Sequence, residues 1–380
     1  MVNSNANALG IIFPNSYDAL VPELVSERLM ASIPFAGRYR MIDFILSSMV
    51  NCGIDNISIL VRNNYYSLMD HLGSGREWDL TRKNGGLNLV PPFAEKSVKI
   101  YNGRIDALAG ILNFLRSQKE KYVVMSDAHI AVNFDFNAMI DAHIASGADV
   151  TVAYAEEELP VLSDHTRPGA KGLFYSLQIE DGRVKKIKIN PQDTGKQNFS
   201  MNIYVIDREL LIDQINTAFV RGNVYFERDV LAPNLEKFNV QAFKFNGYYA
   251  RINDMKSYFN ENMKLLDEKN LDGLFAPNPV YTKIRDDNPT RYISGSKAKN
   301  IMAADGCVIE GEVENSILFR GVKIGKGAKV KNCVLMQDTV VEPGANIEYV
   351  ISDKNVHITA GKELKGTDTL QVFIEKRKIV

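Results

Sequence analysis

The sequence predicts an α/β protein with a mostly parallel sheet, followed by a separate β-solenoid. In the first two thirds, short apolar runs alternate with longer amphipathic ones, which is the pattern of strands and their covering helices. Near residue 275 this alternation ends, and apolar residues then recur every six positions. We therefore expect a first domain over residues 1–275, a linker over 276–290 and a second domain over 291–380.

Five runs rich in Val, Ile and Tyr are short enough to be buried strands. They are ALGIIF (8–13), NISILV (56–61), YVVM (122–125), DVTVAY (149–154) and NIYVID (202–207). Two segments between them, 40–53 and 136–148, carry apolar residues at helical spacing and end near glycine. Such alternation favours a sheet covered on both faces, with ligands beyond the C-terminal ends of the strands.

After the first domain, the stretch PNPVYTKIRDDNP (277–289) contains three prolines and predicts an extended linker. Two ladders of apolar residues with a six-residue period follow: Val322, Ala328, Val334 and Val340, and Leu318, Ile324, Val330 and Met336. A period of six fits a hexapeptide solenoid, in which each repeat forms one flat side of a coil. A β-meander with chance spacing is the alternative.

The charge balance bounds the class of partner. The sequence has 45 Lys and Arg against 46 Asp and Glu, a formal net charge of −1, which argues against a general nucleic-acid binder. Its three cysteines, Cys52, Cys307 and Cys333, are far apart and form no CxxC pair, so we expect neither zinc nor disulfides. With no signal-like start and no long apolar run, we expect a cytoplasmic protein without a membrane partner.

Two stretches carry a family resemblance: PFAGRYRMIDFILSSMVNCG (34–53) and HLGSGREWDLTRKNGGLNLVPPF (71–93). Together with the solenoid, they resemble the bacterial ADP-glucose pyrophosphorylases (glucose-1-phosphate adenylyltransferases) over nearly the whole chain. The resemblance implies a Rossmann-like nucleotidyltransferase domain followed by a left-handed β-helix. It also implies a reaction of ATP with glucose 1-phosphate that gives ADP-glucose and pyrophosphate. Such chemistry needs a glycine-rich phosphate loop, a nearby cation and carboxylates that hold Mg²⁺.

The phosphate-binding positions of that family are altered here. Where the family has paired glycines and an arginine after the first strand, this chain reads LGIIFPNSYDALVPEL (9–24). Side chains and a proline there obstruct a close approach of phosphate to the backbone. Met30 stands at the position of the family's phosphate-binding lysine.

The metal-binding positions differ as well. In SDAHI (126–130), Ala128 replaces the family's metal-binding aspartate and Asp127 lies one residue earlier. Because neighbouring strand residues point to opposite faces, this shift turns the carboxylate away from the site. We interpret Asp127 as a polar cap at the strand end. At the second metal position Arg251 replaces the acid, and Asp254 follows three residues later.

The sugar-phosphate pocket is changed in part. Asn190 stands at the position of the family's lysine, and Tyr175 replaces a glycine and would crowd the pocket. Tyr101 and Ser200 match positions that contact the sugar, so we interpret them as remnants of the pocket. No residue is therefore predicted to be catalytic, and we expect no metal or cofactor on this chain.

A preserved scaffold with an altered site resembles the GlgD-type subunits of bacterial glycogen synthesis. The resemblance implies a regulatory protein with little or no activity of its own. Its expected partner is a GlgC-type catalytic subunit, in a heterotetramer, with Mg²⁺ and ATP bound on that partner.

Family effectors are small anionic metabolites that bind where the two domains meet. The resemblance assigns this role to Arg38 and Arg40, with Arg28 and Arg320 as weaker candidates, because arginine forks suit phosphate. An anionic sugar phosphate is the expected ligand. Surface ion pairs with carboxylates are the alternative for each arginine.

The sequence is also compatible with two other functions. One is an active nucleotidyltransferase that uses the shifted acids Asp127 and Asp254. The other is a hexapeptide acyltransferase, which shares the solenoid and needs a catalytic histidine; His357 is the candidate.

Overall fold

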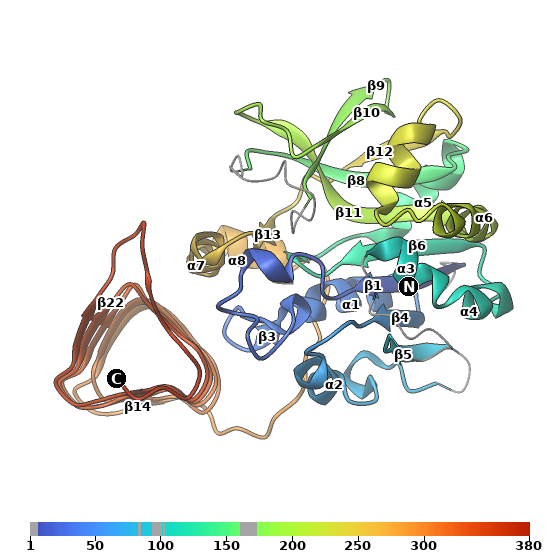
Figure 1. Ribbon diagram of the computed structural model, residues 1–380. Helices are drawn as coiled ribbons and strands as arrows, with labels where there is room; N and C mark the ends of the chain where they lie inside the picture. Colours follow the sequence, from blue (N-terminus) through green and yellow to red (C-terminus); the bar gives the residue numbers. More distant parts are fainter. Residues whose placement is uncertain (1–6, 83–84, 93–100, 102, 160–172) are drawn as a thin grey trace.

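The structure is a computed structural model that describes residues 7–82, 85–92, 101, 103–159 and 173–380 (Figure 1). A nine-stranded sheet flanked by helices is followed by a coil of short parallel strands with a triangular cross-section. The helices are α1 (Met41–Asn51), α2 (Tyr66–Leu72), α3 (Arg104–Ala109), α4 (Leu112–Ser117), α5 (Phe136–Ala145), α6 (Arg208–Val220), α7 (Met255–Lys264) and α8 (Glu268–Phe275). Within the described residues, no helix combines the length and the apolar character needed to cross a bilayer.

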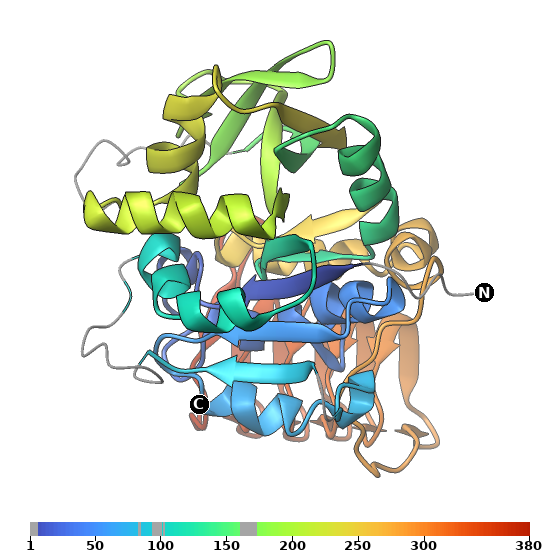
Figure 2. The same ribbon diagram turned by 90° about the vertical axis from the view of Figure 1, so that its right-hand side faces the viewer.

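The nine strands of the large sheet have the order β5-β4-β1-β6-β11-β8-β12-β10-β9. They are β1 (Ala8–Phe13), β4 (Asn56–Leu60), β5 (Gly86–Val90), β6 (Tyr122–Asp127), β8 (Val150–Glu157), β9 (Tyr175–Glu180), β10 (Arg183–Ile189), β11 (Gln197–Asp207) and β12 (Val240–Lys244). Figure 2 shows β1, β4 and β5 side by side, with the solenoid behind them. All five predicted strands are present, and α1 and α5 lie within the two segments predicted to be helical.

The sheet is parallel in two blocks rather than throughout. Strands β5, β4, β1 and β6 are mutually parallel, and so are β8 and β12. Between the blocks, β11 runs antiparallel to both β6 and β8, and β9 and β10 form an antiparallel pair. The antiparallel strand β11 thus separates the two parallel blocks.

Side-chain alternation along β1 divides the domain into two cores. Leu9 and Ile11 face α3, α4 and α6, whereas Ile12 faces α1 and α5. Strand β11 begins five residues before the predicted run. The prediction missed these residues because three of them, Gln197, Asn198 and Ser200, are polar. Its register also shifts between Ser200 and Tyr204, where Asn202 has φ 56°. This irregularity directs Asn202 toward the end of β6.

The second domain is a solenoid of short parallel strands, as the six-residue ladders predict. They are β14 (Arg291–Tyr292), β15 (Lys297–Ala303), β16 (Val308–Ile309), β17 (Glu312–Leu318), β18 (Lys323–Ile324), β19 (Lys329–Lys331), β20 (Val334–Leu335), β21 (Val340–Val341), β22 (Asn346–Glu348), β23 (Val350–Ser352), β24 (His357–Ile358), β25 (Glu363–Lys365) and β26 (Val372–Ile374). The left-handed winding that the resemblance implies stays a prediction.

The predicted ladders slip by one residue on each full turn. Paired residues such as Ile324 and Val341 are 17 positions apart, one fewer than three repeats of six. The last members of each ladder are therefore displaced: Val334 and Met336 lie in the apolar cluster against the first domain, and Cys333 lies in the solenoid core. Val340 is only partly buried, and Leu335, not Met336, lies above Leu318 in the solenoid core.

One side of the solenoid packs against the first domain. Phe319, Met336 and Ile351 share an apolar cluster with Tyr258 and Phe259 of α7. A buried ion pair joins the two domains beside this cluster, because Arg28 Nη2 lies 2.6 Å from Asp353 Oδ1 and both side chains are at most 3% exposed. The domains are thus joined by apolar packing and by one pair of charges that have little contact with water.

We expect the substitution Asp353→Ala to destabilise the protein by about 3–5 kcal/mol, because it leaves the Arg28 guanidinium buried without a counter-charge. The free energy of unfolding from urea titrations measures this cost. Glu375→Ala, which removes an exposed acid of the same domain, is the control and should change it by less than about 0.5 kcal/mol. Equal effects of the two substitutions would contradict the assigned role of the pair.

Candidate functional site

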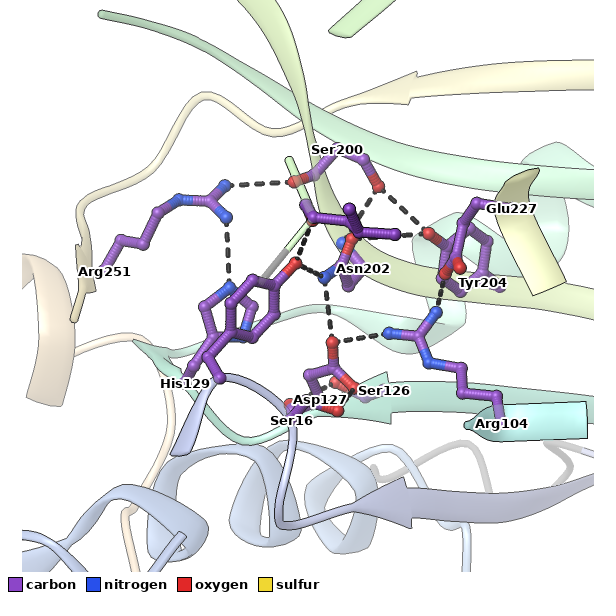
Figure 3. A network of polar contacts seen from close by, with 12 residues as sticks. Ser16, Arg104, Ser126, Asp127, His129, Ser200, Asn202, Tyr204, Glu227 and Arg251 are labelled. Atoms are coloured by element: carbon purple, nitrogen blue, oxygen red, sulfur yellow. Dashed lines mark hydrogen bonds and ion pairs between the residues drawn. The ribbon is translucent and has the colours of Figure 1, made fainter. Parts of the chain in front are cut away.

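The end of β6 lies in a buried polar network at the C-terminal edge of the parallel strands (Figure 3). Asp127, the last residue of β6, accepts hydrogen bonds from Ser16 Oγ at 2.7 Å and from Asn202 Nδ2 at 2.8 Å. Arg104 Nη2 approaches its second oxygen at 2.5 Å. The carboxylate thus contacts the loop after β1, the irregular part of β11 and the start of α3. A simple cap at a strand end would have none of these buried partners.

Arg104 connects Asp127 to a second acid. Its other terminal nitrogen forms an ion pair with Glu227, which lies in a π-helical turn (Phe226–Leu231). The guanidinium also lies 5.3 Å from the ring centre of Phe13 and 5.5 Å from that of Tyr204. The cation that neutralises Asp127 is therefore held by the protein's own carboxylate and aromatic groups.

A second guanidinium, that of Arg251, lies at the neighbouring end of β13 (Tyr249–Arg251). It forms an ion pair with Glu157 at 2.6 Å and donates to the Ser200 carbonyl at 3.1 Å. Its Nη1 lies 3.1 Å from His129 Nε2, so that nitrogen accepts the hydrogen bond and the imidazole proton is on Nδ1. Burial, with repulsion from Arg251 and Arg104, lowers the pKa of His129 well below its usual value.

Tyr17 covers this network from the loop after β1. Its backbone adopts φ 68°, and its ring stacks on His129 with the ring centres 4.2 Å apart. The phenol donates to the Leu173 carbonyl at 2.6 Å and accepts from Asn202 Nδ2 at 2.6 Å. Burial is the main cause that raises the pKa of this phenol. A tyrosine side chain thus occupies the space over His129, next to the end of β6.

The donors present here do not fit Mg²⁺, which needs several free oxygen ligands in octahedral geometry. Both oxygens of Asp127 are engaged by protein donors, and a cation occupies position 251. Asp254 caps α7 by accepting from Ser257 N at 2.6 Å. In the described part of the chain, no group of three His, Cys, Asp or Glu side chains is arranged to hold a metal ion.

The remaining altered positions lie in packed surroundings. Met30 is fully buried, and its backbone N–H donates to Asp18 Oδ1 at 2.7 Å. Ala128 packs in the core on the α1 side of the sheet, away from Arg104, as strand alternation predicts. Asn190 has φ 44° and accepts a hydrogen bond from Phe174 N at 2.8 Å.

The structure separates the two predicted sugar-pocket residues. Ser200 joins the network, since its carbonyl accepts from Arg251 and its hydroxyl lies 3.3 Å from the Tyr204 hydroxyl. Tyr101 packs in the apolar core beside α3, where its hydroxyl donates to the Pro91 carbonyl at 3.4 Å. Tyr175 is buried in that same core, so it fills space there.

A cavity of about 570 Å³ lies between the first domain and the solenoid, and all four predicted effector arginines line it. Its charged lining comprises nine cations and two acids: Arg28, Arg38, Arg40, Lys283, Arg285, Arg320, Lys354, Lys376 and Arg377, with Glu27 and Asp70. The wall is strongly cationic, although the whole chain is nearly neutral. Such an excess concentrates small anions.

The four arginines are not equally free to bind a ligand. Arg28 is paired with Asp353, and Arg38 lies 3.5 Å from Asp305 at the surface. Arg40 donates to Ser67, at 2.6 Å to its carbonyl and 3.0 Å to its hydroxyl. Arg320 donates to the Lys283 carbonyl at 3.2 Å and is 8% exposed. Among the described residues, Arg40 and Arg320 are thus held by neutral oxygen atoms and keep their charge available.

Lys354 is a cavity residue that the sequence analysis missed. It follows β23 at a corner of the solenoid, next to Asp353. Burial, with repulsion from Arg40 and Arg28, lowers the pKa of its ammonium to about 7. The only signal in the sequence was a lysine at a solenoid corner, and lysines are common on protein surfaces. The charges that surround it, Arg28 and Arg40, lie more than 300 positions earlier in the chain.

Comparison with known proteins gives two family matches. Residues 23–268 match the nucleotidyl transferase family, and residues 284–371 match the GlmU-like C-terminal hexapeptide family. The chain is 33% identical to the glycogen biosynthesis protein GlgD of Bacillus subtilis over 98% of its own length and 96% of the relative's. It is 36% identical to GlgD of Geobacillus stearothermophilus, over 86% and 83% of the two chains. It is also 36% identical to the glucose-1-phosphate adenylyltransferase of that organism, over 79% and 77%.

We expect the cavity to bind sulfate about fivefold more tightly at pH 6 than at pH 8, because Lys354 is protonated below its pKa of about 7 and neutral above it. Sulfate is a suitable probe since its own charge is constant over this range. Burial lowers the pKa of His71, so this second titratable group of the wall adds little charge. Isothermal titration measures the affinity.

The substitution Lys354→Gln should flatten this pH dependence, whereas Lys362→Gln, at an exposed lysine of the solenoid, should leave it unchanged. A pH dependence that persists in Lys354→Gln would show that another group titrates.

Proposed function

The chain belongs to the glucose-1-phosphate adenylyltransferase (ADP-glucose pyrophosphorylase) family of glycogen biosynthesis, in its GlgD-type branch, and from this membership we propose that it is a regulatory subunit. In this proposal it makes little or no ADP-glucose itself. It assembles with a GlgC-type catalytic subunit in the cytoplasm, as a heterotetramer, and alters that enzyme's activity. ATP and Mg²⁺ bind on the catalytic subunit.

The observation that carries this proposal is the engagement of Asp127 and Arg251. Phosphoryl transfer needs metal ions and cationic groups aimed at the transferring phosphate. Here Asp127 is neutralised by Arg104, and Arg251 is neutralised by Glu157, while Tyr17 covers His129 between them. Opening this arrangement for a metal-bound triphosphate would break several buried ion pairs, each at a cost of about 3–5 kcal/mol, and the sum is on the order of the whole stability of a domain.

The anion cavity supports the regulatory part of the proposal. Arg40, Arg320 and Lys354 face a common space, and none of them is paired with a carboxylate through its side chain in the described structure. A sugar phosphate or bisphosphate has the size and charge for this space. Because the wall includes residues of both domains, a bound anion would contact both and favour one relative arrangement of them.

An active nucleotidyltransferase that uses Asp127 and Asp254 is the second candidate. Asp127 is the acid nearest to the strand end, which favours it. Against it, Asp127 is bound by Arg104 and Asp254 caps α7. A hexapeptide acyltransferase finds less support, because His357 is 40% exposed on the outside of the coil and pairs with Glu342 at 2.6 Å.

We expect the purified chain to form ADP-glucose from ATP, glucose 1-phosphate and Mg²⁺ at least ~10³-fold more slowly than a catalytic family member, since its metal and phosphate positions are occupied. Mixed with the catalytic glucose-1-phosphate adenylyltransferase of the same organism, it should change that enzyme's kcat or its response to sugar phosphates. Coupled pyrophosphate release measures both.

The variant Asp127→Asn separates the two candidate functions, with Asp141→Asn at an exposed helix position as the control. A regulatory chain carrying either substitution should still alter the catalytic enzyme, provided that it remains folded. If the chain alone instead shows turnover that Asp127→Asn abolishes and Asp141→Asn leaves intact, that result would establish that the chain is an active nucleotidyltransferase.

A further inference from the structure

Lys354 lies at a corner of the solenoid, in the wall of the cationic cavity. The neighbouring coils fix its backbone. Its carbonyl accepts from Arg377 N at 3.0 Å, and the N–H of the next residue, Asn355, donates to the Gln337 carbonyl at 2.9 Å. The side chain is partly buried and borders the cavity. Its ammonium group is therefore presented from a rigid corner to an enclosed space.

The acids around this wall are already used by other cations. Three of them form ion pairs: Glu27 with Lys376, Asp70 with Lys283, and Asp353 with Arg28. Asp353, the acid next to Lys354 in the chain, lies 2.6 Å from the Arg28 guanidinium. Within the described residues, the Lys354 ammonium itself forms neither an ion pair nor a side-chain hydrogen bond. It is a cation among cations, without a counter-charge of its own.

This environment favours the neutral amine of Lys354. Burial, with repulsion from Arg40 and Arg28, lowers the pKa of the ammonium to about 7. About half of it is then deprotonated at neutral pH, whereas an ordinary exposed lysine has roughly one amine in 2,500 free. A neutral lysine amine is a nucleophile, and a neighbouring cation is a known way to activate it.

The cavity selects the electrophile by its charge. A wall with excess cations concentrates small anions. The guanidinium of Arg40 is held by the neutral oxygens of Ser67 and acts electrostatically on Lys354. A phosphate group bound at Arg40 would thus bring an attached carbonyl carbon toward the amine. The same cations would stabilise phosphate as a leaving group.

We propose that Lys354 is a modification site that reacts with acyl phosphates, small anions in which a carbonyl carbon is joined to a phosphate oxygen. The neutral amine attacks the carbonyl carbon and forms an N–C bond. The C–O bond to phosphate breaks, phosphate leaves with the electron pair, and the proton of the amine passes to solvent.

The product is a neutral amide, which ends the repulsion from Arg28 and Arg40 and removes one cation from the wall. Acylation would therefore weaken the binding of a sugar phosphate in the cavity. This regulatory consequence rests on the proposed function, whereas the acylation itself does not.

The test is the reaction of the purified full chain with acetyl phosphate at pH 7.5, followed by mass spectrometry of its peptides. The rate of acetylation at Lys354 is compared with that at Lys362, an exposed lysine of the same domain. A lower pKa frees the amine but also makes it a weaker nucleophile, so we expect a net advantage of about 30-fold for Lys354. Saturating sulfate should remove most of this advantage, because it occupies the cavity.

Two controls separate the amine from the cavity. A neutral reagent, N-hydroxysuccinimidyl acetate, should show a smaller preference for Lys354, since the wall does not concentrate it. Arg40→Gln should slow the reaction of acetyl phosphate at Lys354 about tenfold relative to Lys362. Arg291→Gln makes the same charge change at an exposed position outside the cavity lining and should leave that ratio unchanged.

Equal rates at Lys354 and Lys362, or a rate at Lys354 that sulfate does not change, would overturn the inference. Both measurements use the unaltered chain, so they do not depend on the folding of a variant. Because the assay contains no catalytic subunit, its result is also independent of whether the proposed partnership exists.

Discussion

The ion pair between Asp127 and Arg104 determines what the C-terminal edge of the sheet is able to bind. Asp127 has the chemistry of a metal ligand and a position at the end of a buried strand, but its charge is already neutralised from within the protein. Arg251 and Glu157 form a second such pair nearby. Buried charges are stable only when paired, and breaking one such pair costs several kcal/mol. The site is therefore closed by its own electrostatics as well as by the side chain of Tyr17.

A short segment of chain connects this closed site to the cationic cavity. Ser16 contacts Asp127, Asp18 holds the backbone of Met30, and Arg28 reaches the cavity wall, where it pairs with Asp353. Burial raises the pKa of Asp18 to about 6. Under the proposed regulatory function, a filled site costs the protein no activity, and the same segment connects the sheet to the solenoid. In that proposal the role of the cavity's cations does not depend on catalysis by this chain.

The sequence allowed the main elements to be predicted, because apolar runs and the six-residue period report burial directly. The direction of β11 was not predictable, since a run such as NIYVID is apolar whichever way the strand runs. Val340 is displaced from the core because one turn of the solenoid contains 17 residues rather than 18. This length is known only once the strands are seen to pair. At the site, alternation correctly separates Asp127 from Ala128. Arg104 and Glu227 were missed because they lie outside the two stretches on which the resemblance rests.

The cavity shows what a resemblance adds to such reasoning. Spacing alone does not connect Arg28 with Arg320, and the family comparison pointed to both. Lys354 lacked any such signal, although burial lowers the pKa of its ammonium to about 7. The sequence analysis did not identify residues whose role depends on their three-dimensional position rather than on a motif.

The most direct test of the closed site is isothermal titration of the chain alone with ATP in the presence of Mg²⁺. A parallel titration with sulfate verifies that the same preparation is folded and has a working cavity. The account predicts sulfate binding and no Mg²⁺-dependent binding of ATP at millimolar concentrations. Saturable ATP binding that requires Mg²⁺ and is abolished by Asp127→Asn would contradict it.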